Sequence, residues 1–413
     1  MRPGENVQGR LALAMDALPS GDIGVAVSGG ADSVALLMLL ADWAKASGRT
    51  LKAVTVDHGL RAESASEAAF VAGLCHKLSV SHDTLRWENR PSAGNLQDAA
   101  RRARRYLIAG WAESAGIAIV ALGHTRDDQA ETFLMRLARG SGVDGLSAMA
   151  AVSETEGLVW SRPLLSVSRA SLRHLLEQRA IRWIEDPSND DLRFDRVRAR
   201  RMLVELEPLG LGVDRLAATA ARMARARRAL QSVAAMLAAE CVEWTPFGEA
   251  SLSPAVFAAA LPELQMRVLA DLLCRVSGAE YRPREISLEA LRGRLITMDA
   301  FSGCTLHGCV VRMRRGRIVI RREPRAVGPR VPASEGVWDR RWRIDPGLVF
   351  APDAEIGAVG REGLSGLENW REQGSAREVL LTLPGLWVGG EFVGADLPGA
   401  PVRVGFRHLH ATQ

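Results

Sequence analysis

The chain has 413 residues, 47% of them hydrophobic and 24% charged, with a formal net charge of +5 and a pI near 9.2. These values are ordinary for a globular protein of two or three domains. No stretch approaches the roughly 20 uninterrupted apolar residues of a membrane helix. Residues 1–20 carry acids and lack the apolar centre of a signal peptide, so we expect a cytoplasmic protein.

Five cysteines, at positions 75, 241, 274, 304 and 309, form no Cys-x-x-Cys pair. The odd number gives no disulfide framework, so we expect buried free thiols and no zinc or iron–sulfur site. The positive charge permits a polyanionic partner without requiring one. Only Lys45, Lys52 and Lys77 are lysines, which suggests a compositional bias toward arginine. Arginine clusters are therefore weaker evidence of binding than their number suggests.

The first half of the chain alternates between strand and helix patterns. Strands are predicted at residues 23–27, 51–56, 84–87 and 117–122, and helices at residues 32–46, 63–78, 96–115 and 127–138. This alternation predicts an α/β fold with a doubly wound, mostly parallel sheet and helices on both faces. Right-handed crossovers bring the carboxyl ends of the strands to one edge. Ligands of such sheets bind there, where the strand order reverses.

The pattern changes after residue 189. A helix at residues 168–179 and a turn at 186–189 precede the change, and helices at 213–239, 261–276 and 287–294 follow it. Residues 304–322 alternate as a hairpin with Arg315-Gly316 at its turn. Residues 322–334 have the composition of a linker, and strand-like runs follow at 337–344 and 379–383. We therefore predict a nucleotide-binding domain over 1–209, a helical and hairpin domain over 210–325, and a smaller C-terminal α+β domain over 326–413.

The first predicted strand ends in a glycine-rich loop that opens directly into a helix. Its sequence is Ser28-Gly29-Gly30-Ala31-Asp32-Ser33. The glycines allow a sharp turn and close approach to a ligand, and the amides of a helix N-terminus attract phosphate. Asp32 would repel a phosphate, so we expect it to cap the helix or to hold a metal ion. The simpler alternative is a structural turn with a serine cap.

Two other nucleotide-binding motifs do not fit this sequence. The glycine-rich loop lacks the Gly-Lys-Ser/Thr ending of the other common phosphate loop. Residues 140–145 match the spacing of a dinucleotide fingerprint, but they follow a helix rather than a strand. We therefore expect neither a nicotinamide nor a flavin cofactor.

The fourth predicted strand ends in Gly-His-Thr-Arg-Asp-Asp-Gln-Ala-Glu-Thr, residues 123–132. Asp127, Asp128 and Glu131 lie at helical spacing, and acids at a helix start stabilise the helix without any further role. That explanation does not account for His124, nor for the position of the group on the same sheet edge as the glycine-rich loop. Residues 57–61, Asp-His-Gly-Leu-Arg, end the second strand on that edge as well. We therefore predict a site at this edge.

These motifs resemble those of known families. Ser-Gly-Gly-x-Asp-Ser after a strand resembles the pyrophosphatase loop of the ATP pyrophosphatases, the PP-loop superfamily, whose members split ATP between its first and second phosphates. Residues 123–132, with Leu-Met-Arg-Leu at 134–137 and Arg-Gly-Ser-Gly at 139–142, resemble the tRNA(Ile)-lysidine synthetases in particular. Arg-Pro-Leu-Leu at 162–165 and Trp-Ile-Glu-Asp-Pro-Ser-Asn at 183–189 are similar to later motifs of that family.

The resemblance covers residues 25–201, and beyond residue 209 it continues only in patches. One departure stands at residues 196–200, where Arg-Val-Arg-Ala-Arg replaces the Arg-Asn-Arg-Ile-Arg that is frequent in the family. The resemblance implies a ligase that joins free L-lysine to carbon 2 of the wobble cytidine in the CAU anticodon of tRNA(Ile). ATP adenylates the base with loss of pyrophosphate, and the lysine amine then displaces AMP to form lysidine.

The resemblance also implies roles for individual residues. The loop 28–33 would hold the pyrophosphate of ATP, with Mg²⁺ offsetting its charge. Asp32 and Asp127 are the candidate metal ligands. Asp128 and Glu131 are the candidates for lysine binding, and one of the two would take the proton that the amine loses. With Asp32 and Asp127 these acids form the predicted catalytic set. His124 is a further candidate substrate-binding residue. Arg105 would meet the lysine carboxylate or an RNA phosphate, or lie on a solvated helix face.

The RNA partner is expected on arginine-rich surfaces and on the domain 210–325. Candidate phosphate contacts are Arg193, Arg196, Arg198, Arg200 and Arg201, and, on the long helix, Arg222, Arg225, Arg227 and Arg228. The sequence leaves the oligomeric state open, a homodimer included. Three rival functions fit the sequence less well. A tRNA-thiolating enzyme would usually need paired cysteines, an idle tRNA-binding protein would need no phosphate loop, and an amidotransferase-type synthetase would need an ammonia source.

Overall fold

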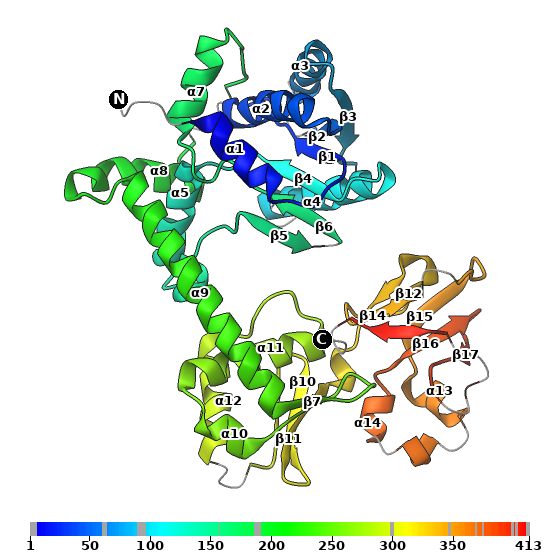
Figure 1. Ribbon diagram of the computed structural model, residues 1–413. Helices are drawn as coiled ribbons and strands as arrows, with labels where there is room; N and C mark the ends of the chain where they lie inside the picture. The colour runs from blue at the N-terminus through cyan, green and yellow to red at the C-terminus, as the bar shows by residue number, and fades with distance from the viewer. Residues whose placement is uncertain are drawn as a thin grey trace. The chain divides into compact units, whose positions relative to one another are not determined.

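The computed structural model describes residues 6–59, 64–88, 96–155, 157–185, 191–297, 301–345, 348–367, 370–373, 376–397, 400 and 404–409 (Figure 1). The chain divides into two compact units, Met1–Arg227 and Arg228–Gln413. Within the described ranges no helix combines the length and the apolar composition needed to cross a bilayer. The five cysteines are free thiols, and Cys75, Cys241 and Cys309 are buried.

The first unit is built on a six-stranded sheet of order β3-β2-β1-β4-β6-β5. The strands are β1 (Ile23–Ala26), β2 (Leu51–Asp57), β3 (Ser81–Arg86), β4 (Ile119–Leu122), β5 (Val152–Thr155) and β6 (Leu158–Ser161). All pairs are parallel except that of β5 with β6. The doubly wound, mostly parallel fold is confirmed. Because β1 pairs with β2 on one side and with β4 on the other, the strand order reverses between β1 and β4.

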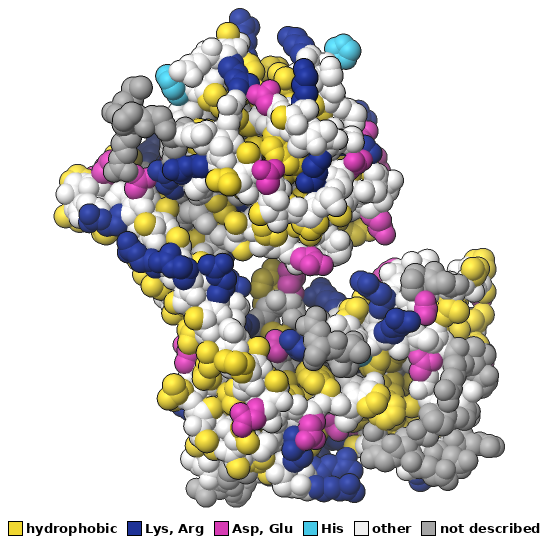
Figure 2. All heavy atoms as spheres, in the orientation of Figure 1, with side chains coloured by type: hydrophobic (Ala, Val, Ile, Leu, Met, Phe, Trp, Pro, Cys, Tyr) yellow, Lys and Arg dark blue, Asp and Glu magenta, His cyan; other side chains and the backbone are white. Residues whose placement is uncertain are grey.

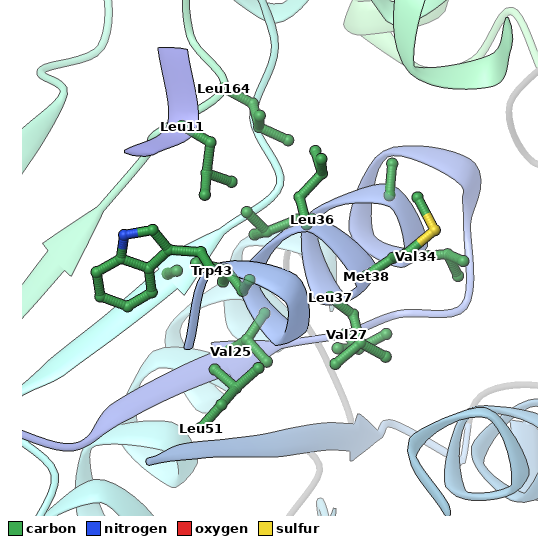
Figure 3. Close-up of a cluster of buried hydrophobic side chains, with 14 of the residues drawn as sticks. Leu11, Val25, Val27, Val34, Leu36, Leu37, Met38, Trp43, Leu51 and Leu164 are labelled. Carbon is green, nitrogen blue, oxygen red and sulfur yellow. The ribbon is translucent and has the colours of Figure 1, made fainter. Parts of the chain in front are cut away.

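Alternating side chains of β1 supply two hydrophobic cores, one on each face of the sheet. Val25 belongs to a cluster with residues of α1 (Val7–Asp16), α2 (Ala31–Ser47), α3 (Ser64–Lys77) and α7 (Arg169–Gln178). Figure 3 shows part of this cluster, where α1 and α2 meet the sheet. Ala26 belongs to the other cluster, with Ile108 and Trp111 of α4 (Leu96–Ser114). Most of α2 is buried, which explains its nearly continuous apolar sequence. Helices therefore cover both faces of the sheet (Figure 1).

A third cluster of the first unit joins the helices that follow β4. Phe133 of α5 (Arg126–Leu137), Leu203 of α8 (Asp195–Leu206) and Leu216 of α9 (Val213–Cys241) pack together, with α6 (Val143–Leu146) and the turn η2 (Glu207–Leu209) nearby in sequence. The predicted strands and helices of this half lie within a few residues of the observed ones. The elements of this half that were not predicted are α1, α6, β5, β6, α8 and η2. The predicted turn at 186–189 lies outside the described residues.

The second unit begins within α9 and contains a five-stranded sheet of order β7-β8-β11-β10-β9. Its elements are β7 (Val242–Trp244), β8 (Ala250–Leu252), α10 (Pro254–Ala259), α11 (Pro262–Ser277), α12 (Glu285–Thr297), β9 (Cys304–Leu306), β10 (Cys309–Arg314) and β11 (Arg317–Arg322). β10 and β11 form the predicted hairpin. Arg315 and Gly316 both have positive φ, +49° and +76°, as a two-residue hairpin turn requires.

Two predictions for the C-terminal region are wrong. The expected linker, 322–334, is folded into η3 (Pro324–Ala326), β12 (Val331–Pro332) and η4 (Ala333–Glu335), and Arg322 forms a 2.8 Å ion pair with Asp339. The expected strand at 379–383 is instead α14 (Arg377–Leu380) and a turn before β16 (Pro384–Val388). A single helical turn buries Val379 and Leu380 together, so the short apolar run fits either structure.

The remaining elements of this region form two small sheets around a separate core. They are β13 (Val337–Trp338), β14 (Trp342–Ile344), β15 (Ala354–Ala358), α13 (Gly360–Ser365), η5 (Trp370–Gln373), β17 (Glu391–Gly394) and β18 (Phe406–His408). Strand-like structure at 337–344 is confirmed by β13 and β14. The three-domain division at residues 209 and 325 stays a prediction.

Candidate active site

The glycine-rich loop lies between β1 and the first turn of α2, whose N-cap is Gly30. Gly29 has a φ of +86°, and a Cβ atom there would lie 2.6 Å from Cδ1 of Ile184. Only glycine satisfies both conditions. The main-chain amide of Ile184 donates to the carbonyl of Gly29 at 2.9 Å, so the segment around Ile184 holds this loop in place.

Two serine side chains stabilise the loop from within. The hydroxyl of Ser33 accepts from the amide of Ser28 at 3.1 Å and donates to the carbonyl of Gly30 at 2.9 Å. The two hydroxyl oxygens, of Ser28 and Ser33, lie 3.2 Å apart. These contacts preform a loop whose amides sit at a helix N-terminus, where partial positive charge favours an anion.

The loop after β4 lies directly against this helix N-terminus. A Cβ atom on Gly123 would lie 3.1 Å from the carbonyl carbon and oxygen of Asp32 and from the Cα atom of Ser33. Glycine at position 123 allows this close approach, because a Cβ atom there would push the backbone of Asp32 and Ser33 away by a few tenths of an ångström. The structure thus brings together the two loops that the sequence places at the same edge of the sheet.

Asp128 has a structural role in addition to any chemical one. Thr125, the N-cap of α5, accepts a hydrogen bond from the amide of Asp128, and Asp128 Oδ2 accepts from the Thr125 amide at 2.8 Å and from its hydroxyl at 2.7 Å. This reciprocal arrangement is a capping box. It accounts for Asp128 Oδ2 and leaves Oδ1 for other contacts.

Arg169, the first residue of α7, connects all the predicted acids. Its Nε atom is 3.0 Å from Asp32 Oδ2, its Nη2 atom is 3.2 Å from Asp128 Oδ1, and its Nη1 atom is 3.2 Å from Glu131 Oε1. Its main-chain amide donates to Asp127 Oδ2 at 2.8 Å. Four acids that lie on two helices therefore converge on one residue of a third helix.

Sequence reasoning did not identify Arg169. Its side-chain partners are 137, 41 and 38 positions away in the chain, so no local spacing pattern reveals the contacts. Arg200 was predicted only as part of an RNA-binding patch, but its Nε atom lies 3.0 Å from Glu131 Oε1. The sole available signal was the arginine itself, located just after the Arg-Pro-Leu-Leu motif.

Three polar atoms of the predicted residues are buried and have no hydrogen-bond partner among the residues that the structure describes. They are Asp32 Oδ1, His124 Nδ1 and Glu131 Oε2. Buried polar atoms are normally paired, because desolvation without a partner is costly. Unpaired atoms from three different predicted site residues therefore indicate a place that is completed by a ligand.

The environment shifts the pKa values of two acids in opposite directions. Burial raises the pKa of Asp32, and the nearby charges of Asp128 and Asp127 add to the rise, although Arg169 opposes it. Burial also acts to raise the pKa of Asp128, but the charge of Arg169 and the hydrogen bonds from Thr125 outweigh it, and the pKa is lowered. The three acids raise the pKa of Arg169 despite its burial, so it stays charged.

His124 is neutral at physiological pH. Burial lowers its pKa to about 4, and the positive charges of Arg162, Arg196 and Arg104 act in the same direction, while Asp128 opposes them. A neutral imidazole offers one donor and one acceptor nitrogen. The surrounding arginines make this side of the site favourable for an anionic group.

The structure does not join Arg105 to the acids. Its Nη2 atom donates to Thr155 Oγ1 at 2.6 Å, and its guanidinium carbon lies 5.7 Å from the ring centre of Trp160. Thr155 pairs with Leu158, the first residue of β6, and therefore lies toward the edge opposite the strand carboxyl ends. In the loop after β2, the His58 ring contacts Trp87 edge-on at 6.0 Å, and residues 60 and 61 lie outside the described part.

The predicted arginine patches have different environments. Arg193 pairs with Asp191, Arg198 pairs with Asp195, and Arg227 donates to Ser147 Oγ at 3.2 Å. Arg201 is exposed on α8. Figure 2 shows basic side chains gathered over the region where α8 and the first turns of α9 lie in Figure 1.

Comparisons with known proteins show similarity over most of the chain. Residues 3–207 match the family described as the PP-loop domain. The chain is 41% identical over 395 residues to the tRNA(Ile)-lysidine synthase of Ruegeria pomeroyi, covering 96% of this chain and 93% of that protein. It is 39% identical over 348 residues to the enzyme of that name from Hyphomonas neptunium, covering 80% and 91%. For that of a Bradyrhizobium strain the identity is 44% over 286 residues, covering 67% and 80%.

Proposed function

The chain belongs to the tRNA(Ile)-lysidine synthase family, and from this we propose that it ligates free L-lysine to the wobble cytidine of tRNA(Ile) with a CAU anticodon. It is an ATP-dependent carbon–nitrogen ligase. The base is adenylated on the oxygen at carbon 2 with loss of pyrophosphate, and the lysine amine then displaces AMP to form lysidine. The observation that carries the proposal is the meeting of the glycine-rich loop with acids, two of which have buried oxygens that lack partners in the described residues.

We propose that residues 28–33 hold the pyrophosphate portion of ATP. The amides at the start of α2 and the hydroxyls of Ser28 and Ser33 supply donors in a preformed arrangement. Such donors stabilise negative charge that develops on a leaving group without needing to reorganise. Neutral His124 and its neighbouring arginines would lie beside the phosphates.

Mg²⁺ is proposed as the metal, with Asp32 and Asp127 as its protein ligands. Asp32 Oδ1 is buried without a partner, and Asp127 uses Oδ2 for the Arg169 amide, which leaves its Oδ1 for a metal. Mg²⁺ is commonly held by one or two carboxylates together with substrate phosphates, so this donor set fits. When bound, the ion would offset charge on the leaving pyrophosphate.

The lysine ε-amine is proposed to bind beside Glu131 and Asp128. Glu131 is 1% exposed, and its Oε2 atom is buried without a partner, so a cation there would complete its coordination. The amine must lose a proton before it attacks. Both oxygens of Asp128 are engaged by Thr125 and Arg169, which favours Glu131 as the acceptor of that proton. The role of Arg105 in substrate binding stays a prediction. To reach the substrate, its side chain would have to break its hydrogen bond to Thr155.

The tRNA is proposed to contact the arginines of α8 and α9 and the predicted domain 210–325. Exposed arginines without a full complement of internal partners can bind backbone phosphates, whose contribution to affinity falls with salt. A wobble base is unpaired, so it can be presented to the site without opening a duplex. A cytoplasmic location is also proposed, and the oligomeric state stays open, a homodimer included.

The test is ATP-dependent incorporation of labelled lysine into an unmodified tRNA(Ile) transcript with a CAU anticodon. A methionine tRNA, which has the same anticodon, is the control. We expect incorporation into the first RNA only, with one AMP and one pyrophosphate formed per lysine. Cleavage of ATP to AMP without lysine transfer would leave the PP-loop chemistry in place and show that the acceptor is wrong. No ATP cleavage at low salt with Mg²⁺ would overturn the proposed function.

A further inference from the structure

We propose that Arg169 is a positioning residue that couples the ATP loop to the acids that would bind lysine. The inference rests on the function proposed above and goes beyond it in assigning one side chain to both halves of the reaction. Arg169 bonds Asp32 on α2 and both Asp128 and Glu131 on α5. No other described side chain joins these two helices at the site by ion pairs.

The geometry of the contacts depends on the guanidinium group. Each of its three nitrogens engages a different carboxylate, at 3.0 Å for Asp32 and 3.2 Å for Asp128 and Glu131. A planar group with donors in fixed directions can hold three acids in one arrangement. A lysine ammonium carries its donors on a single nitrogen and would not span the same three oxygens.

The arginine is itself held firmly. Its amide donates to Asp127 Oδ2, and Leu172 and Leu176 on the following turns are fully buried in the core that includes α2. Its side chain is 19% exposed. A group anchored through its backbone and partly buried acts as a fixed reference for its partners rather than following them.

The pairing also selects which oxygen atoms remain for ligands. Arg169 occupies Asp32 Oδ2 and Glu131 Oε1, and the other oxygen of each, Asp32 Oδ1 and Glu131 Oε2, is buried without a partner. The oxygen proposed to bind the metal ion and the oxygen proposed to bind lysine therefore belong to two carboxylates that the same guanidinium group holds. A displacement of the guanidinium group would therefore affect both oxygens.

Without Arg169 the acids would lose their common counter-charge. Asp32, Asp128 and Glu131 would then face one another with Arg200 on Glu131 as the remaining described ion pair among them. Like charges at close range repel and displace flexible carboxylates. Displacement of reacting groups by about 1 Å costs on the order of 100-fold in rate.

The experiment compares Arg169→Lys and Arg169→Met with Arg179→Lys as a matched control. Arg179 ends the same helix and also pairs with α2, through Asp42 at 2.7 Å, but it touches none of the site acids. Each protein is assayed for lysine incorporation at varied lysine and varied ATP, for ATP binding by equilibrium dialysis with labelled ATP and Mg²⁺, and for thermal unfolding.

We expect both Arg169 variants to lower kcat/KM for lysine by on the order of 100-fold and to raise KM for ATP as well. The kcat/KM of Arg169→Lys should lie within a few-fold of that of Arg169→Met, because a positive charge without the planar guanidinium group does not position the three acids. Arg179→Lys should behave as the wild type. Recovery of most activity in Arg169→Lys would show that charge alone suffices and overturn the proposal. So would a loss of folding in both variants, which would assign Arg169 to stability.

A double-mutant cycle on ATP binding separates this inference from the proposed function. Glu131→Gln is combined with Arg169→Met, and Kd for ATP is measured in all four proteins. Coupling through Arg169 predicts that Glu131→Gln changes Kd when Arg169 is present and has no further effect when it is absent. Additive effects would overturn the coupling. Because this readout needs neither lysine nor tRNA, it remains decisive even if the wild type fails to incorporate lysine.

Discussion

Glu131 is the most deeply buried of the four acids at the site, and one of its oxygens has no partner within the described ranges. An ionised carboxylate in that environment is costly unless a cation or hydrogen-bond donor completes it. Arg169 and Arg200 both bind the other oxygen, Oε1. At the scale of single residues, Glu131 therefore has one oxygen paired with arginines and one oxygen available to a ligand.

The first prediction concerns Glu131→Gln. The amide keeps the shape of the side chain but removes its charge and its ability to accept a proton. We expect lysine incorporation to fall by about 10²–10⁴-fold, the usual contribution of a general base. Glu177→Gln is the control, since Glu177 is 63% exposed on α7. Steady-state kinetics check the prediction, and near-normal turnover in Glu131→Gln would exclude this acid as the base.

The second prediction concerns the pH dependence of stability. The unfolded chain binds a proton at His124 below its ordinary pKa of 6.5, whereas the folded protein does so only near 4. The free energy of unfolding should therefore fall as the pH drops from 6.5 toward 4, by at most about 1.4 kcal/mol per pH unit from this group. His124→Gln should show a smaller slope in that window. Urea unfolding at several pH values measures both slopes, and equal slopes would contradict the assignment.

At the scale of secondary structure, loops and caps hold the site in place. Thr125 begins α5 and shares a capping box with Asp128, so the same carboxylate that faces Arg169 also sets the start of the helix. Gly29 and Gly123 allow the first turn of α2 to meet the segments around it at distances that a side chain would prevent. The residues that hold the site in place therefore lie mainly at helix N-termini and in the loops before them.

The third prediction concerns the cap of α5. Thr125→Ala removes the hydroxyl that pairs with Asp128 and should lower the free energy of unfolding by about 1 kcal/mol. Activity should fall as well, because Asp128 loses one of its restraints. Thr125→Ser keeps the hydroxyl and should restore both. Denaturant unfolding and lysine incorporation are the measurements, and full activity in Thr125→Ala would show that the cap does not orient Asp128.

The fourth prediction concerns the glycine-rich loop. Gly29→Ala imposes a positive φ on alanine and brings its Cβ to 2.6 Å from Ile184, so we expect ATP binding to be lost or greatly weakened. Gly48→Ala is the matched control. Gly48 also has a positive φ, +69°, but open space around it, so it tests backbone strain alone. Equal loss of ATP binding in the two variants would contradict a role for the loop geometry.

At the scale of the whole molecule, the first unit alone contains the proposed ATP and lysine sites, while basic side chains extend over α8 and α9. Arginine is frequent throughout the sequence, so number alone does not identify an RNA-binding surface. Arg200 illustrates the point, because its side chain is 39% exposed and yet its Nε atom pairs with Glu131. Exposed arginines such as Arg201 are better candidates for phosphate contacts.

The fifth prediction concerns the salt dependence of tRNA binding. The logarithm of the association constant should fall linearly with the logarithm of salt concentration. Arg201→Gln should weaken binding at low salt and reduce that slope by about 0.7–0.9 if one phosphate contact is lost. Arg49→Gln is the control, because Arg49 bonds the carbonyls of Pro19 and Gly21. An unchanged slope in Arg201→Gln would place the RNA elsewhere.

Much of the fold could be predicted because its signals are local. The alternation of apolar strands and helices, the glycine-rich loop and the turn at Arg315-Gly316 each depend on neighbouring residues, and the structure confirms them. Helix α8 was missed because arginines surround its few buried positions, Val197, Ala199 and Leu203. The helical turn at 377–380 was mistaken for a strand because a short apolar run has no period long enough to distinguish the two.

From the sequence we could predict the PP-loop domain, the sheet edge proposed for the site and, through the family resemblance, the acids and histidine proposed to form it. Each of these follows from motifs of consecutive residues and from the handedness of strand–helix units. Only the tertiary structure decided which atoms remain for ligands, that Arg105 turns toward Thr155, and that Arg169 joins Asp32 to Asp128 and Glu131. Those contacts connect residues as far as 137 positions apart, and ion pairs at such separation leave no periodic trace in a single sequence.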